Sequence, residues 1–362
     1  MRVQRLVMPD GSASWTVLDD QGGVISPAEA FLAHLQALNR SPETVRTYAT
    51  SLKLWWEFLG GVGCGFDTAT VDHVARFVAW LRAPEENVAV LEGGSARCSP
   101  ATLNRHLAGL FSFYDYQARN GVPLAQQLVA WRRSNRGGFR PFLHHATGGR
   151  AVATRPLRVR QPRQVPRTLT DDQLLAIVEA CEHLRDRFLL VLLAETGMRV
   201  GQALGLRHAD FVSHRRELHI VPRADNANGA RAKTLTPAVI PVSAGLVRLY
   251  TAYMFEEYGD CDSDYVFVNL FAEPCGAPLR YQAVHKLVYR LRERSGVDFT
   301  LHMLRHTRAT SLLRGGVDVE VVARLLGHRS SVTTSQIYAH LDTGDLREQL
   351  TRCGAWAAGE PQ

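Results

Sequence analysis

Lysine is nearly absent from this sequence, although the protein is rich in basic residues. The 42 basic residues comprise 39 arginines and only three lysines, Lys53, Lys233 and Lys286. A compositional bias accounts for most of this imbalance. Each retained lysine is still informative, because lysine can release its proton inside a protein and arginine cannot.

Paired cysteines, leader signals and membrane-spanning runs are also lacking. The six cysteines are scattered, with no C-x-x-C pair and no zinc-like spacing with histidine, so we interpret them as free thiols in a reducing compartment. The N-terminus has no apolar core typical of a signal peptide. No window approaches the ~20 apolar residues of a spanning helix. These absences predict a cytoplasmic protein that does not insert into a membrane.

What is present indicates a globular protein with a polyanionic partner. At 362 residues the chain is long enough for two domains, and 46% hydrophobic with 21% charged residues is typical of a soluble fold. The net charge of +7 and the pI of about 9.3 favour binding to a polyanion.

The positive charge is concentrated in the middle of the chain. Between Tyr116 and Thr170 there is no acidic residue, and prolines and glycines recur. This composition predicts an extended basic linker over 121–167. A solvated linker is the simplest interpretation, but an unbroken run of one sign favours a segment that follows a nucleic-acid backbone. Between Tyr116 and Thr170 there are eleven arginines: Arg119, Arg132, Arg133, Arg136, Arg140, Arg150, Arg155, Arg158, Arg160, Arg163 and Arg167.

Residues 26–120 have the pattern of a four-helix bundle. Helices are expected to start at three Ser-Pro pairs, where serine caps the helix and proline takes its first position, and a further apolar run covers 72–81. Gly60-Gly61 and Asn120-Gly121 are expected to end two of these helices. The aromatic stripes predict a hydrophobic core. Residues 1–25 are interpreted as a short strand-and-turn leader.

Basic residues outside the predicted bundle core are candidates for DNA contacts. Isolated surface charges usually do nothing specific, so this assignment depends on the partner being a nucleic acid. The candidates are Arg46, Lys53, Arg105, Arg119, Arg158, Arg160 and Arg163.

Residues 168–342 are predicted to form a second domain that mixes helices with a small antiparallel sheet. Helices are expected over 171–183, 185–196, 244–259 and 279–295, with 264–269 a strand or an extended segment. Period-two patterns at 211–212, 218–221 and 239–242 predict three strands. Asn228-Gly229 predicts a hairpin turn between the last two, with Lys233 just beyond it. Arg199 follows a buried helix and a tight glycine turn, which is well suited to hold it rigid.

Polar side chains recur at short intervals near the C-terminus. His302 and Arg305 are three apart, so a helix places them on one face, and Gly315-Gly316 is expected to end that helix. A second apolar run ends at Gly327, and His328 and Tyr338 follow. Taken singly, Tyr338 is as well explained by a half-buried aromatic and His302 by a surface histidine.

Taken together and in order, these motifs resemble the catalytic domain of the tyrosine recombinase (integrase) family. Thr196-Gly-Met-Arg199 resembles the first arginine motif, and Lys233 resembles the hairpin lysine. His302-Met-Leu-Arg305-His-Thr resembles the H-x-x-R-H-T signature, Leu326-Gly-His328 the L-G-H motif, and Gln336-Ile-Tyr338 the nucleophile segment. The resemblance implies a SAM-like core-binding bundle over 26–120, a mainly α catalytic domain over 168–342 and a C-terminal tail over 343–362.

The resemblance also implies a role for each site residue in a phosphoryl transfer that needs no cofactor and no metal. Arg199 and Arg305 would clamp the non-bridging oxygens. Tyr338 would be the nucleophile; since its ordinary pKa is about 10 it needs a base, for which His302 is the best candidate. His328 would hydrogen-bond a non-bridging oxygen, and Lys233 would protonate the leaving 5′-hydroxyl. His208, His306 and His340 are taken as structural. Gln202 departs from the family pattern, which often has Glu there.

The activity implied is site-specific DNA recombination through a 3′-phosphotyrosine intermediate, on a transposon or other mobile element. Double-stranded DNA is the expected partner, with four copies of the chain assembled on two sites. Two alternatives share the fold: a type IB topoisomerase-like relaxing enzyme and an inactive DNA-binding regulator. All six catalytic positions implied by the resemblance hold residues that could carry out the reaction, which disfavours the inactive regulator. A metal-dependent nuclease is a third, for which the sequence offers no site; cleavage in EDTA would separate it.

Overall fold

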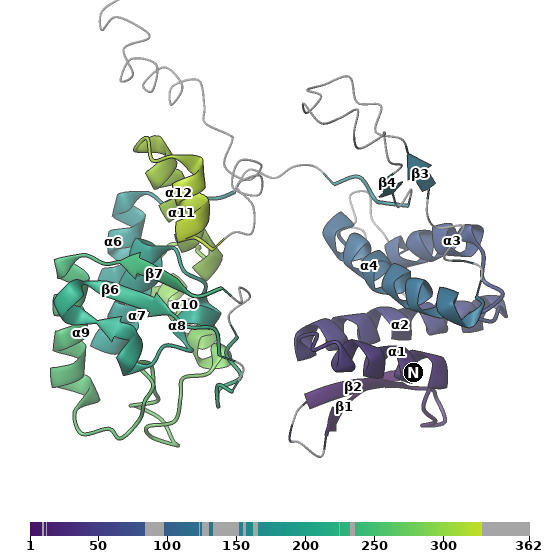
Figure 1. Ribbon diagram of the computed structural model, residues 1–362, viewed down its shortest axis with the longest axis horizontal. Helices are drawn as coiled ribbons and strands as arrows, with labels where there is room; N and C mark the ends of the chain where they lie inside the picture. The colour runs from purple at the N-terminus through teal and green to yellow at the C-terminus, as the bar shows by residue number, and fades with distance from the viewer. Residues whose placement is uncertain are drawn as a thin grey trace, which may run out of the picture. The chain divides into compact units, whose positions relative to one another are not determined.

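The computed structural model describes residues 1–8, 11, 13–83, 98–122, 124, 130–132, 152–154, 157–161, 166–223, 225–231 and 236–327. The chain divides into two compact units, Met1–Arg163 and Gln164–Gln362 (Figure 1). Among the described residues, no helix is both long and apolar enough to cross a membrane.

The first unit is built around helices with an aromatic core, as the sequence predicts. Its most buried side chains include Phe31, Trp55, Phe77, Phe113 and Tyr114. The Trp55 indole donates to the Tyr114 hydroxyl (3.0 Å), which donates to the Phe66 carbonyl (2.8 Å), so the polar ends of these aromatics are satisfied. The helices are α1 (Ser26–Ala37), α2 (Pro42–Val62), α3 (Val71–Arg82) and α4 (Pro100–Gln117), which continues as a 3₁₀ turn, Ala118–Asn120.

Two of the three predicted serine caps are confirmed and one is wrong. Ser41 and Ser99 each accept a hydrogen bond from the backbone N–H three residues on (3.2 Å). Ser26 instead lies inside α1, whose capping position is Ile25 with no side-chain hydrogen bond. The predicted end of α2 at Gly60-Gly61 is also wrong. Glycine weakens a helix without forbidding it, and α2 ends where Gly63 turns left-handed (φ +65°).

The N-terminal residues add a β-hairpin to this unit. Strands β1 (Arg2–Val7) and β2 (Ala13–Leu18) pair antiparallel, with Arg2 opposite Leu18. The hairpin packs on α2, and Val17 and Thr16 are almost fully buried (Figure 1). Residues 1–25 therefore contribute to the core of the first unit.

Part of the segment predicted as a basic linker also belongs to the first unit. Two short strands, β3 (Ala130–Arg132) and β4 (Val152–Thr154), pair antiparallel. The Asn104 side chain on α4 donates to the Val159 carbonyl (2.9 Å) and accepts from the Val159 N–H (3.0 Å). These two hydrogen bonds hold the stretch around Val159 against the helical bundle.

The second unit packs helices around a three-stranded antiparallel sheet, as predicted. Helix α7 (Leu184–Thr196) is central and contacts α6 (Asp171–Glu179), α9 (Ala244–Tyr253) and α11 (Leu301–Arg314) (Figure 1). The sheet has the order β5 (Phe211–Val212), β6 (Glu217–Ile220) and β7 (Ala238–Pro241). The remaining elements are α8 (Val200–Ala203), 3₁₀ turns at His208–Asp210 and Ser213–Arg215, a π-helix Met254–Tyr258, α10 (Tyr281–Ser295) and α12 (Val319–Leu325).

The segment 264–269, expected as a strand or an extended stretch, is extended and buried. Val266, Phe267 and Val268 are fully covered, and single backbone bridges join Tyr265 to Arg207 and Val268 to Pro278.

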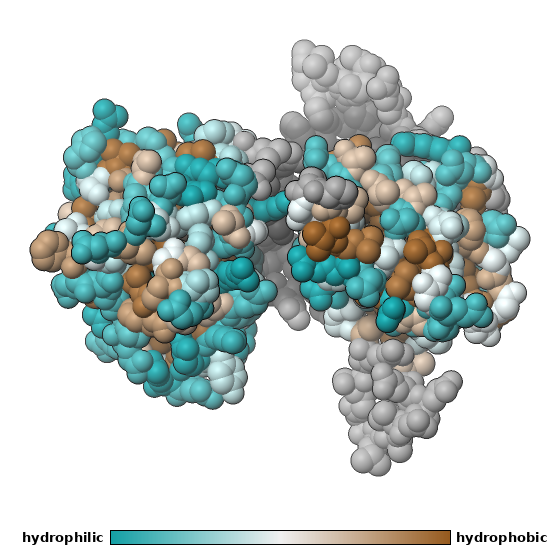
Figure 2. Space-filling view, turned by 90° about the horizontal axis from the view of Figure 1, so that it is seen from below, coloured by the Kyte–Doolittle hydropathy of each residue, from teal (hydrophilic) through white to brown (hydrophobic). Residues whose placement is uncertain are grey.

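On the face shown in Figure 2, hydrophilic residues cover most of both units and apolar residues gather in scattered patches. The buried apolar side chains of the second unit mainly form one core, which includes those of α7.

Candidate active site

The turn after α7 fixes the position of Arg199. Gly197 takes a left-handed conformation (φ +65°) that side chains disfavour. The Thr196 hydroxyl donates to the Leu192 carbonyl (2.6 Å) and accepts from the Met198 N–H (3.3 Å), so the turn is held from both sides. Arg199 follows at the capping position of α8.

Gln202 supports Arg199 through the main chain. Its Oε1 accepts a hydrogen bond from the Arg199 N–H at 2.8 Å, which satisfies a donor that the first turn of α8 leaves unpaired. A glutamate would offer the same acceptor atom. The replacement of the usual glutamate by Gln202 therefore leaves the backbone of Arg199 held.

Helix α11 carries His302 and Arg305 on one face, as predicted. Thr300 caps the helix by accepting from the Met303 N–H (3.3 Å), and the helix ends at Arg314 just before Gly315, as expected. His302 is exposed near the start of the helix, whereas Arg305 is 3% exposed. A buried guanidinium must have partners, because a buried unpaired charge is very costly.

The Arg305 guanidinium joins segments that are far apart in the sequence. Its Nη1 donates to the Gly197 carbonyl and its Nη2 to the Leu326 carbonyl, each at 2.7 Å. The fork therefore holds together the turn that leads to Arg199 and the end of α12. A hydrogen bond from a charged donor is stronger than one between neutral groups, so this contact is rigid.

The same two segments also touch through apolar atoms. A Cβ added to Gly197 would lie 2.7 Å from the Leu326 side chain, so only glycine fits this approach. Gly327 follows with φ +63° and ends α12, as the sequence predicts. His328 is the next residue along the chain and lies, like Tyr338, outside the described residues.

Arg199, His302 and Arg305 line one pocket of about 350 Å³. They come from two regions about a hundred residues apart in the sequence, and the fold brings them together. The pocket is bordered by the start of α8, by α10 and by the first turn of α11. Three of the six predicted catalytic residues thus share a pocket; the other three, Lys233, His328 and Tyr338, lie outside the described residues.

His306, which the sequence analysis took as structural, is half-buried beside the pocket. Its ring lies edge-on to that of His302, with centroids 4.7 Å apart. Burial, with the charges of His302 and Arg305 adding to it, lowers the pKa of His306 to about 4. The imidazole is therefore neutral at pH 7.

The connection that carries Lys233 is long and contains the predicted Asn-Gly turn. Strands β6 and β7 do pair, but their last partners are Ile220 and Ala238, so the connection between them is long. Asn228-Gly229 does form a turn, with φ +71° at Gly229 and its N–H bonded to the Asn226 carbonyl (2.8 Å). That turn lies inside the connection and does not join the two strands directly.

The pocket contains further polar residues that the sequence analysis missed: Arg231, Tyr281, His285 and Arg292. Tyr281 and His285 are four apart on α10 and their rings are in contact (centroids 4.6 Å), so helical periodicity could have grouped them. Periodicity does not say which face of α10 lies beside α11. Arg231 had no such signal, because nothing in its neighbourhood distinguishes it from the other arginines.

The DNA-contact candidates of the first unit differ in their surroundings. Arg105, Arg119, Arg158 and Arg160 are exposed, and Arg163 lies outside the described residues. The Arg46 guanidinium lies over the Trp15 ring (5.2 Å) and 3.7 Å from Glu43. Lys53 is half-buried and pairs with Glu57 at 3.0 Å, which neutralises it locally.

The fold agrees with what comparison with known proteins shows. Residues 167–344 match the phage integrase family, and residues 28–121 match the phage integrase N-terminal SAM-like domain. The chain belongs to this family of tyrosine recombinases.

Its relatives include a transposase and a tyrosine recombinase. Transposase A from transposon Tn554 of Staphylococcus aureus is 36% identical over 355 residues, covering 97% of this chain and 98% of the relative. Tyrosine recombinase XerD of Mycobacterium tuberculosis is 32% identical over 257 residues, covering 68% and 76%.

Solved structures of the same fold include protein–DNA complexes. XerH site-specific recombinase bound to palindromic difH substrate, a post-cleavage complex, matches with a TM-score of 0.61 and 21% identity, covering 93% of this chain and 90% of XerH. The Tn1549 transposon integrase in complex with transposon right end DNA matches with a TM-score of 0.59 and 14% identity, covering 91% and 99%. At these identities the likeness concerns the fold.

Proposed function

We propose that this protein cuts and rejoins double-stranded DNA at specific sites through a covalent bond between Tyr338 and a 3′-phosphate. The observation that carries the proposal is the pocket in which Arg199 and Arg305 lie with His302. Two guanidinium groups in one pocket suit the non-bridging oxygens of a phosphodiester, on which negative charge accumulates in the transition state.

The proposed reaction is a transesterification that conserves the phosphodiester bond energy. The Tyr338 oxygen attacks phosphorus and the bond from phosphorus to the 5′-oxygen breaks. His302 takes the tyrosine proton, and the Lys233 ammonium gives a proton to the leaving oxygen. His328 donates a hydrogen bond to a non-bridging oxygen. Attack by a 5′-hydroxyl of another strand reverses these steps and releases the tyrosine.

The rigidity of Arg305 supports its part in this clamp. Guanidinium donors that are fixed before the substrate binds need no reorganisation as charge develops. The two carbonyls of Gly197 and Leu326 supply this fixation. Through the Arg305 side chain, these contacts join the turn before Arg199 to the end of α12.

The relatives support recombination of a mobile element, and we propose four protomers on two DNA sites as the assembly that carries it out. A transposase is similar over nearly the whole chain, and solved structures of the same fold are complexes with recombination substrates. The type IB topoisomerase-like enzyme remains the second candidate, because it uses the same tyrosine chemistry without pairing two duplexes.

The decisive experiment is covalent trapping of the wild-type chain and Tyr338→Phe. Duplexes that span the DNA flanking the gene, nicked near the cleavage position, are incubated with each protein and run on a denaturing gel. Wild type should give a protein–DNA adduct, and Tyr338→Phe should give none while it still shifts the duplex on a native gel. An adduct with Tyr338→Phe would refute the nucleophile assignment.

A further inference from the structure

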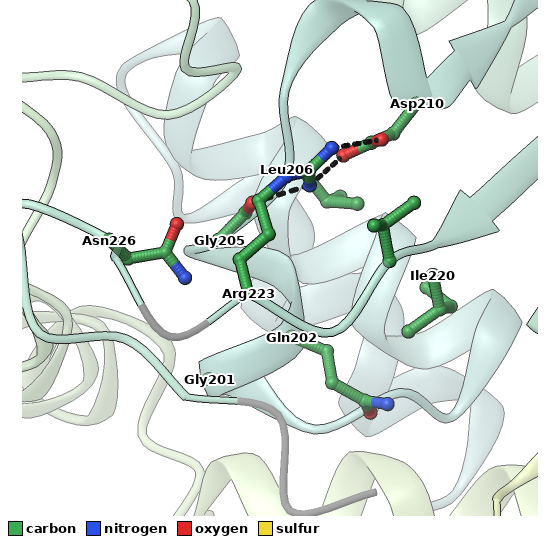
Figure 3. Close-up of a pocket in the computed structure, with 9 residues that line it drawn as sticks. Gly201, Gln202, Gly205, Leu206, Asp210, Ile220, Arg223 and Asn226 are labelled. Carbon is green, nitrogen blue, oxygen red and sulfur yellow. Dashed lines mark hydrogen bonds and ion pairs between the residues drawn. The ribbon is translucent and has the colours of Figure 1, made fainter. Parts of the chain in front are cut away.

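The connection between β6 and β7 folds back against α8 and the residues that follow it. A Cβ on Gly201 would lie 2.7 Å from the Arg231 carbonyl oxygen, and one on Gly205 would lie 2.9 Å from the Asn226 amide nitrogen. Gly201 therefore lies directly against the backbone of Arg231, and Gly205 lies against the Asn226 side chain. Figure 3 shows Gly201, Gly205 and Asn226 in this arrangement.

An ion pair fastens the start of the connection. Arg223 binds Asp210 through two hydrogen bonds, Nη1 to Oδ2 at 2.6 Å and Nη2 to Oδ1 at 2.7 Å (Figure 3). Asp210 is 3% exposed and also accepts from the Arg207 N–H (2.9 Å). A bidentate ion pair with a buried carboxylate has a well-defined geometry, so the connection leaves the sheet in a fixed direction.

Asn228 ties the middle of the connection to two other segments. Its Nδ2 donates to the Leu204 carbonyl, just after α8, and to the Leu279 carbonyl, just before α10, each at 2.9 Å. Its Oδ1 accepts from the Ala230 N–H (3.0 Å). One half-buried side chain therefore joins three segments that are distant in the sequence.

This anchorage lies next to the catalytic pocket. The described stretch that precedes Lys233 ends at Arg231, which lines the pocket together with Arg199, His302 and Arg305. Lys233 follows Arg231 by two residues, and two residues of chain reach no further than about 7 Å.

We propose that Asn228 is a positioning residue for the step that needs Lys233: it holds the β6–β7 connection, up to Arg231, against α8 and the pocket that Arg231 lines. The inference rests on the proposed function, in which Lys233 protonates the leaving oxygen. Asn228 touches neither the pocket residues nor the reacting atoms and acts only through the backbone it holds.

The test compares Asn228→Ala on two substrates that differ in one atom. The first is a normal duplex, and the second carries a 5′-bridging phosphorothioate, whose sulfur leaves without needing a proton. Asn228→Ala should cleave the oxygen substrate roughly 10- to 100-fold more slowly than wild type, as a misplaced catalytic group does. It should cleave the sulfur substrate at close to the wild-type rate, as Lys233→Ala should.

Three controls make the result specific. Asn269→Ala removes a side chain that donates to the Pro274 carbonyl in another loop of the same unit and should change neither rate. Arg199→Ala should slow both substrates. If Asn228→Ala lowers the thermal unfolding midpoint of the full chain strongly, Asn228→Asp, which keeps the size and the acceptor for Ala230, takes its place.

The outcomes separate this inference from the proposed function. Equal slowing of both substrates by Asn228→Ala, or no slowing of either, overturns the positioning role. A wild-type chain that forms no covalent adduct on either substrate overturns the proposed function itself. An adduct with wild type but no sulfur rescue of Asn228→Ala overturns the inference alone.

Discussion

At the scale of single residues, hydrogen bonds to the main chain fix the surroundings of the proposed catalytic groups. Gln202 does not need a charge for its observed contact, because its amide oxygen accepts from the Arg199 N–H. The Arg305 guanidinium likewise donates hydrogen bonds from two of its five N–H groups to backbone carbonyls. In both cases, a side chain at the pocket holds the main chain of a neighbouring segment in place.

Gln202 gives a prediction at this scale. Gln202→Ala removes a capping contact of about 1 kcal/mol, so the cleavage rate should fall about fivefold. The fall should be equal on the oxygen and sulfur substrates, because Arg199 acts in both. Gln202→Glu keeps the acceptor atom and should retain the wild-type rate. A large loss with Gln202→Glu would show that the neutral amide itself is required.

Residues predicted from the sequence and residues missed differ in how local their signals are. Arg199, His302 and Arg305 stand in short motifs with fixed spacing, and the structure brings all three to one pocket. Asn228 contacts the residues just after α8 and just before α10, and the Arg231 carbonyl lies against Gly201 of α8; no local pattern encodes these contacts. Such contacts depend on how the connection folds back, which only the tertiary structure determines.

At the scale of elements, the packing of α7, α11 and α12 forms the pocket's frame. Gly197 is the point where all three meet: its carbonyl accepts from Arg305, and its missing side chain leaves space for Leu326. The helices themselves were predictable from apolar periodicity, as were the three strands. Their ends were less so: Gly60 and Gly61 continue a helix that Gly63 ends, because only Gly63 adopts the left-handed conformation.

Gly197→Ala tests this frame. The left-handed backbone costs a non-glycine residue roughly 1–2 kcal/mol, and the new Cβ would also collide with Leu326. We expect a thermal midpoint lower by about 2–8 °C and a cleavage rate lower on both substrates. The matched control is Gly296→Ala after α10, which has φ +68° and open space around it.

Gly296→Ala should lower the midpoint by a similar backbone strain and leave cleavage unchanged. Comparing the two variants therefore separates backbone strain from the contact with Leu326. Equal cleavage rates for both would mean that the α7–α12 contact does not support the pocket.

At the scale of the whole molecule, charge and division into two units both favour a DNA partner. The net charge is +7, and the arginines between Tyr116 and Thr170 face no acidic residue in that stretch. The first unit takes in part of that stretch, since Asn104 binds Val159. The overall composition predicts polyanion binding; it does not separate a recombinase from a relaxing enzyme.

The last prediction separates these two enzymes by stoichiometry and product. Tyr338→Phe is mixed with duplexes that carry the cleavage site identified by covalent trapping. The expected complex contains four protomers and two duplexes. Light scattering after gel filtration should then give about 161 kDa of protein, since one chain is 40.2 kDa. On a plasmid with two sites, wild type should exchange the flanking segments, and a plasmid without sites should remain supercoiled. One protomer per duplex, with relaxation of both plasmids, would instead establish the topoisomerase-like activity, since strand rotation needs neither a second duplex nor a specific pair of sites.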